Sequence, residues 1–323
     1  MGHPQVAGVI ASRPSVGGTL RLMSIELALH AGGGCLRRRD LVTDGSGSRG
    51  LALLEGSGRV VKAGRGLYAL PGTSADVVAA RAAGGLVTCV SLAAHLGLPM
   101  LEPPEAPHVA VSGNRGAPTS RSLPPGTVIH WDSSVTARSV TRTGTAPIAS
   151  TPEALLHVMS CLPRRDAVAL IDSALNRSHC TLAQLQALRP RSGRLRFDQV
   201  LRAVDGRSQS LPESFLRLAL ISAGLRAEPQ VVLLGVGQVD LLVERLLVVE
   251  VDGFAYHSGR REFREDRRRD RVAGTLDIPV LRFVFEDAVH FSDRSVLEVT
   301  EVLDRLKRRG ARPVSEDLIL RSA

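Results

Sequence analysis

The chain has 323 residues, of which 44% are hydrophobic, and its formal net charge is +9. This length has room for two or three domains, and the hydrophobic fraction argues against global disorder. No stretch approaches eighteen uncharged apolar residues, and no compact apolar segment follows a basic start, so we predict neither a membrane span nor a secretory signal.

The cysteines predict the compartment. All four lie far apart and form no C-x-x-C pair: Cys35, Cys89, Cys161 and Cys180. This spacing excludes a zinc site of paired cysteines and indicates no disulfide framework. We therefore expect a cytoplasmic protein.

The positive charge is concentrated near the N-terminus. Residues 1–73 carry nine Lys and Arg against four acids, and residues 74–205 carry thirteen against nine. Residues 206–310 balance at seventeen each. A basic excess favours nucleic acid as a partner. Because only Lys62 and Lys307 are lysines, an arginine bias from a GC-rich genome is the alternative explanation.

The first seventy residues predict a tail and a small DNA-binding fold. Residues 1–22 are read as a disordered tail because residues 1–20 are rich in Gly, Pro, Ala and Ser. In residues 23–73 we expect three helices: the first capped by Ser24, the second over 38–43, and the third capped by Ser46 or Ser48 with Leu51, Leu53 and Leu54 inward. A hairpin over 59–70 turns at Ala63-Gly64-Arg65-Gly66. This order is typical of a winged helix-turn-helix.

The next segment, residues 74–190, is predicted to be a mixed α/β middle domain, and we assign it no chemistry. The expected helices and strands are helices at 75–84, 91–96, 152–161, 165–177 and 181–188, and strands at 108–111 and 128–130. Thr151 is the expected cap of the third of these helices, with Pro152 in its first turn. An Arg/Gly/Ser-rich linker over 191–209 follows, with a helical patch at 197–204.

Residues 210–310 have the sharpest pattern. We predict helices at 212–223, 261–274 and 293–309 and strands at 228–234, 238–244, 246–252 and 278–284. The order α-β-β-β-α-β-α describes a small mixed sheet flanked by helices. Residues 311–323 are read as a tail. The whole chain is therefore α/β (α+β), with a winged helix, a mixed middle region and a C-terminal mixed sheet.

Carboxylates interrupt the apolar sequence of two predicted strands in this last domain. Asp240 lies in the second strand, and Glu250 and Asp252 share one face of the third. If the two strands form a hairpin, Asp240 reaches that face, and Glu213 can project from the preceding helix. Carboxylates in a strand of Val and Leu need water, a partner or a cation. Converging oxygen donors suit Mg²⁺ or Mn²⁺.

Each carboxylate has a structural alternative. Ser210-x-x-Glu213 is also a capping box. Asp240 and Glu250 could instead pair with Arg245 or Arg282.

These acids carry a resemblance to a known family. Pro212-Glu213-Ser214, Val239-Asp240-Leu241, Val249-Glu250-Val251-Asp252-Gly253, Phe263-x-x-Asp266-x-x-Arg269-Asp270 and Pro279-Val280-Leu281-Arg282-Phe283 resemble the PD-(D/E)XK nuclease superfamily, and more closely a branch related to very-short-patch-repair (Vsr) endonucleases. The resemblance covers residues 208–310. It implies a restriction-endonuclease-like fold and metal-dependent hydrolysis of DNA, with Asp240, Glu250 and Asp252 as metal ligands and Glu213 as a further catalytic residue.

One position departs from that pattern. The motif lysine of the superfamily falls at position 252, which is Asp here. In the Vsr-like branch a histidine can act as general base, and His257 is the candidate. The alternative is a solvated loop histidine. The arginine-rich helix at 260–271 is either a solvated face or a set of phosphate contacts.

The N-terminal part resembles the winged-helix domain of abortive-infection type IV antitoxins. The Gly64-Arg65-Gly66-Leu67-Tyr68-Ala69-Leu70 wing carries this resemblance, and Ser91-Leu92-Ala93-Ala94, His108-Val109 and Thr151-Pro152-Glu153 are similar to the region that follows it in actinobacterial relatives. Such proteins bind promoter DNA. The resemblance places Ser48 and Arg49 near base edges, and Arg59, Lys62 and Arg65 on phosphate or in the minor groove. A winged helix used only for protein contacts is the alternative.

Two functions from different classes follow. The first is a double-stranded-DNA-binding protein with a Mg²⁺- or Mn²⁺-dependent, Vsr-like endonuclease domain. The second is a non-enzymatic, antitoxin-type transcriptional regulator with a degenerate nuclease-like domain. The expected protein partner is a toxin or another component of a phage-defence system. A third interpretation is a defence-system component whose last domain binds a protein partner.

Overall fold

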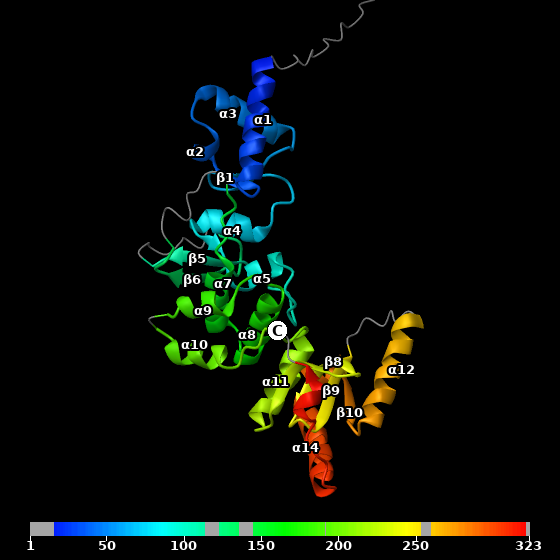
Figure 1. The fold of residues 1–323 in the computed structure, drawn as a ribbon. Helices are drawn as coiled ribbons and strands as arrows, with labels where there is room; N and C mark the ends of the chain where they lie inside the picture. Colours follow the sequence, from blue (N-terminus) through cyan, green and yellow to red (C-terminus); the bar gives the residue numbers. More distant parts are fainter. Residues whose placement is uncertain (1–15, 114–122, 136–144, 191, 253–259, 321–323) are drawn as a thin grey trace, which may run out of the picture. The chain divides into compact units, whose positions relative to one another are not determined.

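A computed structural model of the protein describes residues 16–113, 123–135, 145–190, 192–252 and 260–320. The chain divides into two compact units (Figure 1). The first comprises Met1–Ser91 and Pro104–Ala149, and the second comprises Leu92–Pro103 and Ser150–Ala323. None of the helices in the described residues is long and apolar enough to cross a membrane. The α/β class predicted from the sequence is confirmed, and the sheets are small and mixed.

The first unit begins with three helices and a hairpin, in the predicted order. These elements are α1 (Val16–Ala31), β1 (Cys35–Arg37), α2 (Arg38–Leu41), α3 (Gly45–Gly56), β2 (Val61–Gly64) and β3 (Leu67–Ala69). The strands form one antiparallel sheet in the order β1-β3-β2. Buried side chains of α1 and α3, among them Leu29, Leu51 and Leu54, form the core.

Three local predictions in this region were wrong. The first helix begins at Val16, so residues 16–22 are helical rather than a tail and Ser24 lies inside the helix. Asp44, not Ser46 or Ser48, caps α3, because its side chain accepts from the Gly47 N–H at 2.7 Å. Leu53 is exposed, since the inward face of α3 is set by the three-residue spacing of Leu51 and Leu54.

A second sheet completes the first unit. Helix α4 (Ala75–Ala83) precedes β4 (Leu86–Val87), β5 (His108–Ser112) and β6 (Val128–Asp132). The order is β4-β5-β6, antiparallel and then parallel. Buried Arg81 of α4 donates to the carbonyls of Cys35 and Gly32, and one apolar core joins α4 and this sheet to β1 and β3. The predicted boundary at residue 73 therefore lies inside one compact unit.

The second unit contains the remaining helices of the predicted middle domain. Helix α5 (Cys89–His95) begins in the first unit; α7 (Thr151–Cys161), α8 (Arg164–Asn176), α9 (Leu182–Ala187) and α10 (Arg194–Leu201) follow. Ser150 rather than Thr151 caps α7, and Pro152 lies in the first turn as predicted. Part of the predicted linker is α10. Residues 150–190 thus belong with the C-terminal part, because Ala169 of α8 shares a core with α11.

The sheet of the second unit follows the predicted order. Helix α11 (Leu211–Ser222) leads into β7 (Ala227–Leu233), β8 (Gly237–Val243) and β9 (Leu247–Asp252), followed by α12 (Arg260–Thr275), β10 (Val280–Val284), α13 (Phe285–Val289) and α14 (Ser292–Arg308). The strand order is β10-β9-β8-β7-β11, with only β9 and β10 parallel. The predicted C-terminal tail instead contains a short 3-10 turn, Glu316–Leu318, and β11 (Ile319–Leu320), which pairs with β7.

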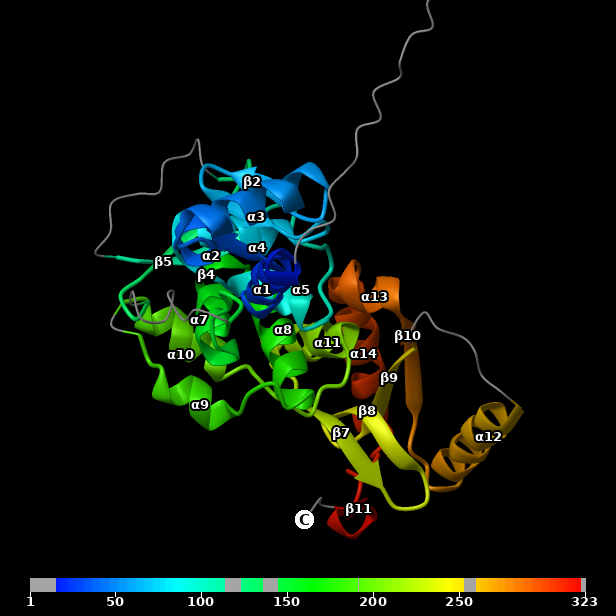
Figure 2. The ribbon, with the colours of Figure 1, turned by 90° about the horizontal axis from the view of Figure 1, so that it is seen from above.

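Helices cover both faces of this sheet. On one face, apolar side chains of α11 and α14 pack on β8, β9 and β10. On the other face lies α12 (Figure 2), and its Ala273 belongs to the same buried core as Val239, Leu242 and Val248. The carboxylates of β8 and β9 therefore lie within a sheet that is covered on both sides, where an ion without a partner is costly.

Candidate functional site

The candidate site lies where β8 and β9 stop pairing. Their ladder runs from Val243↔Leu247 to Leu241↔Val249, so the next pair along the two strands is Asp240 and Glu250. Opposite residues of an antiparallel pair project from the same face. The ladder ends before that pair, and Val239 and Leu241 belong to cores on opposite faces of the sheet, so the strand register does not test the prediction that Asp240 reaches the face of Glu250.

Asp240 accepts two hydrogen bonds in place of strand pairing. Its Oδ2 accepts from the Val251 N–H at 2.9 Å, and its Oδ1 accepts from the Gln230 amide at 3.3 Å. Burial raises the pKa of Asp240, the Val251 hydrogen bond lowers it, and the nearby negative charge of Glu213 raises it again. The carboxylate thus lies in a site where a positive charge would be favourable.

Gln230 joins Asp240 to Glu213. Its Nε2 donates to Oε2 of Glu213 at 2.7 Å as well as to Asp240. Gln230 has a φ of 57°, a left-handed conformation that is uncommon outside glycine, in the middle of strand β7. Such backbone conformations concentrate at functional sites. Sequence reasoning missed this residue, and the polar side chain within Glu-Pro-Gln-Val-Val was the available signal.

Glu213 is buried in the first turn of α11. The capping-box alternative is half right: Ser210 accepts from the Glu213 N–H, but the Glu213 carboxylate accepts from the Gln209 N–H at 3.0 Å rather than from that of Ser210. Glu213 therefore supports the helix start and also contributes negative charge to the candidate site.

Glu250 is held between two arginines. Its Oε1 lies 3.0 Å from Nη2 of Arg269 on α12, and its Oε2 lies 3.3 Å from Nε of Arg282 on β10. Burial raises the pKa of Glu250, the two arginines lower it, and Asp240 raises it. The predicted pairing with Arg282 is present. Arg245 instead lies 2.5 Å from Glu316 and 3.9 Å from Glu228.

The structure gives less information on the other two predicted site residues, Asp252 and His257. Asp252, at the end of β9, is half-buried. His257 lies outside the described residues. Within the described part of the chain, the carboxylates are not drawn together into a group of three whose ligand atoms all lie within 4.8 Å. A cation bound there would have to draw the carboxylates closer and displace an arginine from Glu250.

The candidate DNA-binding side chains differ in their exposure and in the contacts that they make within the protein. Arg49, Lys62 and Arg65 are exposed. The Ser48 hydroxyl accepts from Nη2 of Arg38 at 2.8 Å. Arg59 lies 2.5 Å from Glu26 of α1, so an acid already opposes its charge.

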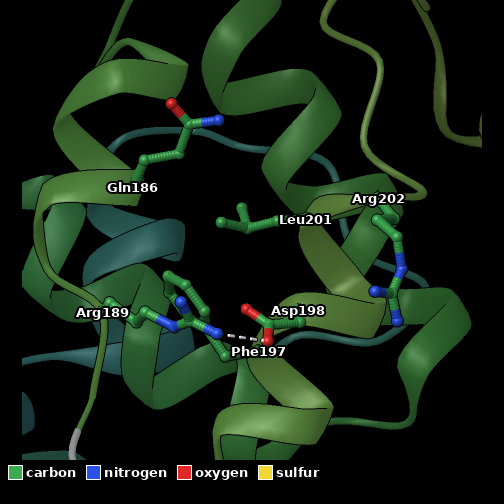
Figure 3. A pocket seen from close by; sticks show the side chains of 6 residues that line it. All are labelled: Gln186, Arg189, Phe197, Asp198, Leu201 and Arg202. Carbon is green, nitrogen blue, oxygen red and sulfur yellow. Dashed lines mark hydrogen bonds and ion pairs between the residues drawn. The ribbon is translucent and has the colours of Figure 1, made fainter.

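A separate hollow of about 440 Å³ lies beside α9 and α10 (Figure 3). Its lining side chains are Gln186, Arg189, Phe197, Asp198, Leu201 and Arg202. Arg189 and Asp198 form a 2.6 Å ion pair across it. Because Arg189 already pairs with the Asp198 carboxylate that a cationic ligand would need, we assign the hollow no ligand.

Comparison with known proteins gives relatives but no function. No protein-family model matches the chain. It is 28% identical, over 238 residues, to two uncharacterized proteins of Mycobacterium tuberculosis, MT2308 of strain CDC 1551 / Oshkosh and Rv2248 of strain H37Rv. The match covers 70% of this chain and 84% of each relative.

Proposed function

We propose that the protein binds double-stranded DNA and that its second unit is a metal-dependent, Vsr-like endonuclease domain. One observation carries the proposal: buried Glu213 and half-buried Asp240 share the amide of Gln230, and the charge of Asp240 raises the pKa of half-buried Glu250. Like charges gathered in a buried place cost stability, and such clusters mark functional sites.

The donor set fits a hard divalent cation. Asp240 and Glu250 would be the first ligands of Mg²⁺ or Mn²⁺, with Asp252 beside them and Glu213 as a further carboxylate. When bound, the ion supplies positive charge to a phosphodiester and to an attacking water. Gln230 holds the Asp240 and Glu213 carboxylates in place through its amide, while Arg269 and Arg282 offer positive charge for phosphate once Glu250 turns to the ion.

The direct test is a nuclease assay on the full chain. Plasmid, mismatched and branched DNA are incubated with Mg²⁺ or Mn²⁺, with chelator as the blank. We expect nicking or linearisation of at least one substrate that depends on the ion. Failure of every substrate with both ions, together with no heat of Mg²⁺ or Mn²⁺ binding in calorimetry, would contradict the endonuclease proposal.

DNA affinity is assigned to the three-helix and hairpin region, interpreted as a winged helix. Replacing Arg49, Lys62 or Arg65 with alanine should weaken binding and reduce the slope of log K against log salt by about one unit for each lost phosphate contact. Arg59→Ala should have a smaller effect because Glu26 already opposes that charge. The measurement is a salt series of fluorescence anisotropy titrations on duplex DNA.

A matched control comes from the second unit. Arg294 is also an exposed arginine with a carboxylate partner, 3.0 Å from Glu298 on α14. Arg294→Ala should leave affinity and slope unchanged. Equal losses for Arg294→Ala and Arg49→Ala would mean that net charge, not this region, governs binding.

The second candidate function is a non-enzymatic, antitoxin-type regulator. The ion pairs from Arg269 and Arg282 to Glu250 favour it, because side chains of the protein already supply the positive charge. Asp at position 252, where the superfamily has lysine, favours it as well. This candidate predicts DNA binding that is unaffected by divalent ions, with a toxin or other defence component as protein partner.

A further inference from the structure

The first unit holds a different group of metal-ligating side chains, Cys89, His108 and His130. The ligand atoms contributed by these three residues lie within 4.8 Å of one another. Nδ1 of His108 is 3.1 Å from Nε2 of His130. Cys89 is buried and both histidines are half-buried, so the three groups meet where water is restricted.

Strand register explains why residues far apart in sequence meet here. In the parallel pair β5–β6, His108 is opposite Val128 and Ala110 is opposite His130. Residues two apart on a strand share a face, so both histidines project from the same face of the sheet. Strand β4 lies on the other side of β5, and the Thr88 N–H donates to the His108 carbonyl at 3.0 Å. The residue after Thr88 is Cys89.

The backbone at Cys89 is also unusual. Its φ is 52°, in the left-handed region that non-glycine residues seldom adopt. Strain of this kind persists where the surrounding structure holds a side chain in a required position. Here the constraint accompanies a thiol near two imidazoles.

We propose that Cys89, His108 and His130 bind a zinc ion. One thiolate and two imidazoles are a borderline-soft set that suits Zn²⁺ and not Mg²⁺. Tetrahedral zinc with Zn–N distances of about 2.0–2.1 Å separates two ligand nitrogens by about 3.3 Å. The observed nitrogen–nitrogen separation of 3.1 Å is close to this value.

Binding of the zinc ion releases one proton from the protein. Cys89 gives up its thiol proton to solvent on binding, and the histidines bind as neutral imidazoles through Nδ1 of His108 and Nε2 of His130. The fourth tetrahedral position is left for water or another ligand. A hydrogen bond between the two histidines alone would account for their short contact, but it would not account for the third ligand atom.

The site would stabilise the first unit. It joins β5, β6 and the junction of β4 with α5, and this sheet shares its core with β1 and β3 of the proposed winged helix. A ligand that binds only the folded state raises the unfolding temperature by mass action. Zinc should therefore raise the melting temperature of the full chain, and a chelator should lower it.

The experiment uses the full chain, stripped of metal and titrated with Zn²⁺ or Co²⁺. Metal analysis should give one zinc per chain at this site. Co²⁺ should give the visible bands of a tetrahedral ion and a near-ultraviolet sulfur-to-cobalt band. Cys89→Ser should weaken the sulfur band. Cys89→Ser, His108→Ala or His130→Ala should weaken binding by more than about 100-fold, since loss of an outer partner alone costs 10–100-fold.

Matched controls separate this site from adventitious binding. Cys35→Ser removes another buried thiol of the same unit, and His30→Ala removes an exposed histidine of α1. Both should bind Co²⁺ as the unaltered chain does. Absence of a stoichiometric tetrahedral cobalt spectrum from the unaltered chain, or unchanged Co²⁺ affinity in Cys89→Ser, would overturn the proposal.

Discussion

Replacing Asp240 with asparagine should abolish metal-dependent DNA cleavage and leave DNA affinity unchanged. The substitution keeps the size of the side chain but removes the charge that faces Glu213 and Glu250. Because a metal at this site would act on the reacting phosphate and affinity is assigned to the first unit, we expect a loss of at least about 1,000-fold in rate, equivalent to about 4 kcal/mol. Single-turnover cleavage and anisotropy titration measure the two quantities separately.

Related variants make the result specific. Glu250→Gln should be as inactive as Asp240→Asn, whereas His257→Ala should slow cleavage by about 10²–10⁴-fold if the histidine is the general base. Glu298→Gln removes an exposed carboxylate of α14 and should cleave normally. Thermal unfolding establishes that each variant is folded. Retained cleavage in Asp240→Asn would mean that Asp240 is not a metal ligand. An equal loss of cleavage in Glu298→Gln would mean that the effect is not specific to the candidate metal site.

Most of the elements in the second unit could be predicted because their patterns are local. The runs of Val and Leu at β7, β8 and β9 and the Gly224 stop after α11 fix strands and helix ends to within a few residues. The short turn between β8 and β9 fixes their register as far as Leu241↔Val249, one pair before Asp240 and Glu250. These acids were therefore accessible to sequence reasoning.

Contacts that depend on distant partners could not be predicted. Arg269 reaches Glu250 from a helix nineteen residues along the chain, and Gln230 acts through a left-handed backbone that no propensity indicates. The predicted boundary at residue 73 falls inside one compact unit for the same reason, because Arg81 and the apolar core around it join the regions on either side. His108 and His130 have no metal-motif spacing, because strand pairing rather than sequence separation brings them together.

The interior of the second unit contains an ion pair whose disruption should be costly. Arg217 of α11 donates to Asp172 of α8 at 2.8 Å, and both side chains are almost fully buried. Ser214 and the Asp205 N–H donate to the same carboxylate. Burial nevertheless raises the pKa of Asp172 to about 6, against the opposing effect of Arg217. The pair thus joins α8 to α11, the helix that carries Glu213.

Replacing Arg217 with methionine should lower the free energy of unfolding by about 3–5 kcal/mol at pH 7.5, because it leaves a buried carboxylate without its counter-charge. The loss should be smaller at pH 5. Folding raises the pKa of the Asp172 carboxyl, so the folded state binds its proton more readily than the unfolded state does. The contribution of Asp172 to stability therefore falls as pH rises from the ordinary pKa of an aspartate to about 6. Removing Arg217 raises this pKa further and extends the fall to higher pH. Urea unfolding at both pH values measures the difference in the free energy of unfolding.

Combining Arg217→Met with Asp172→Leu should restore most of the lost stability and abolish the pH dependence of the loss, since no charge is then buried. If the single variant loses the same amount at both pH values, Arg217 stabilises through packing and not through Asp172.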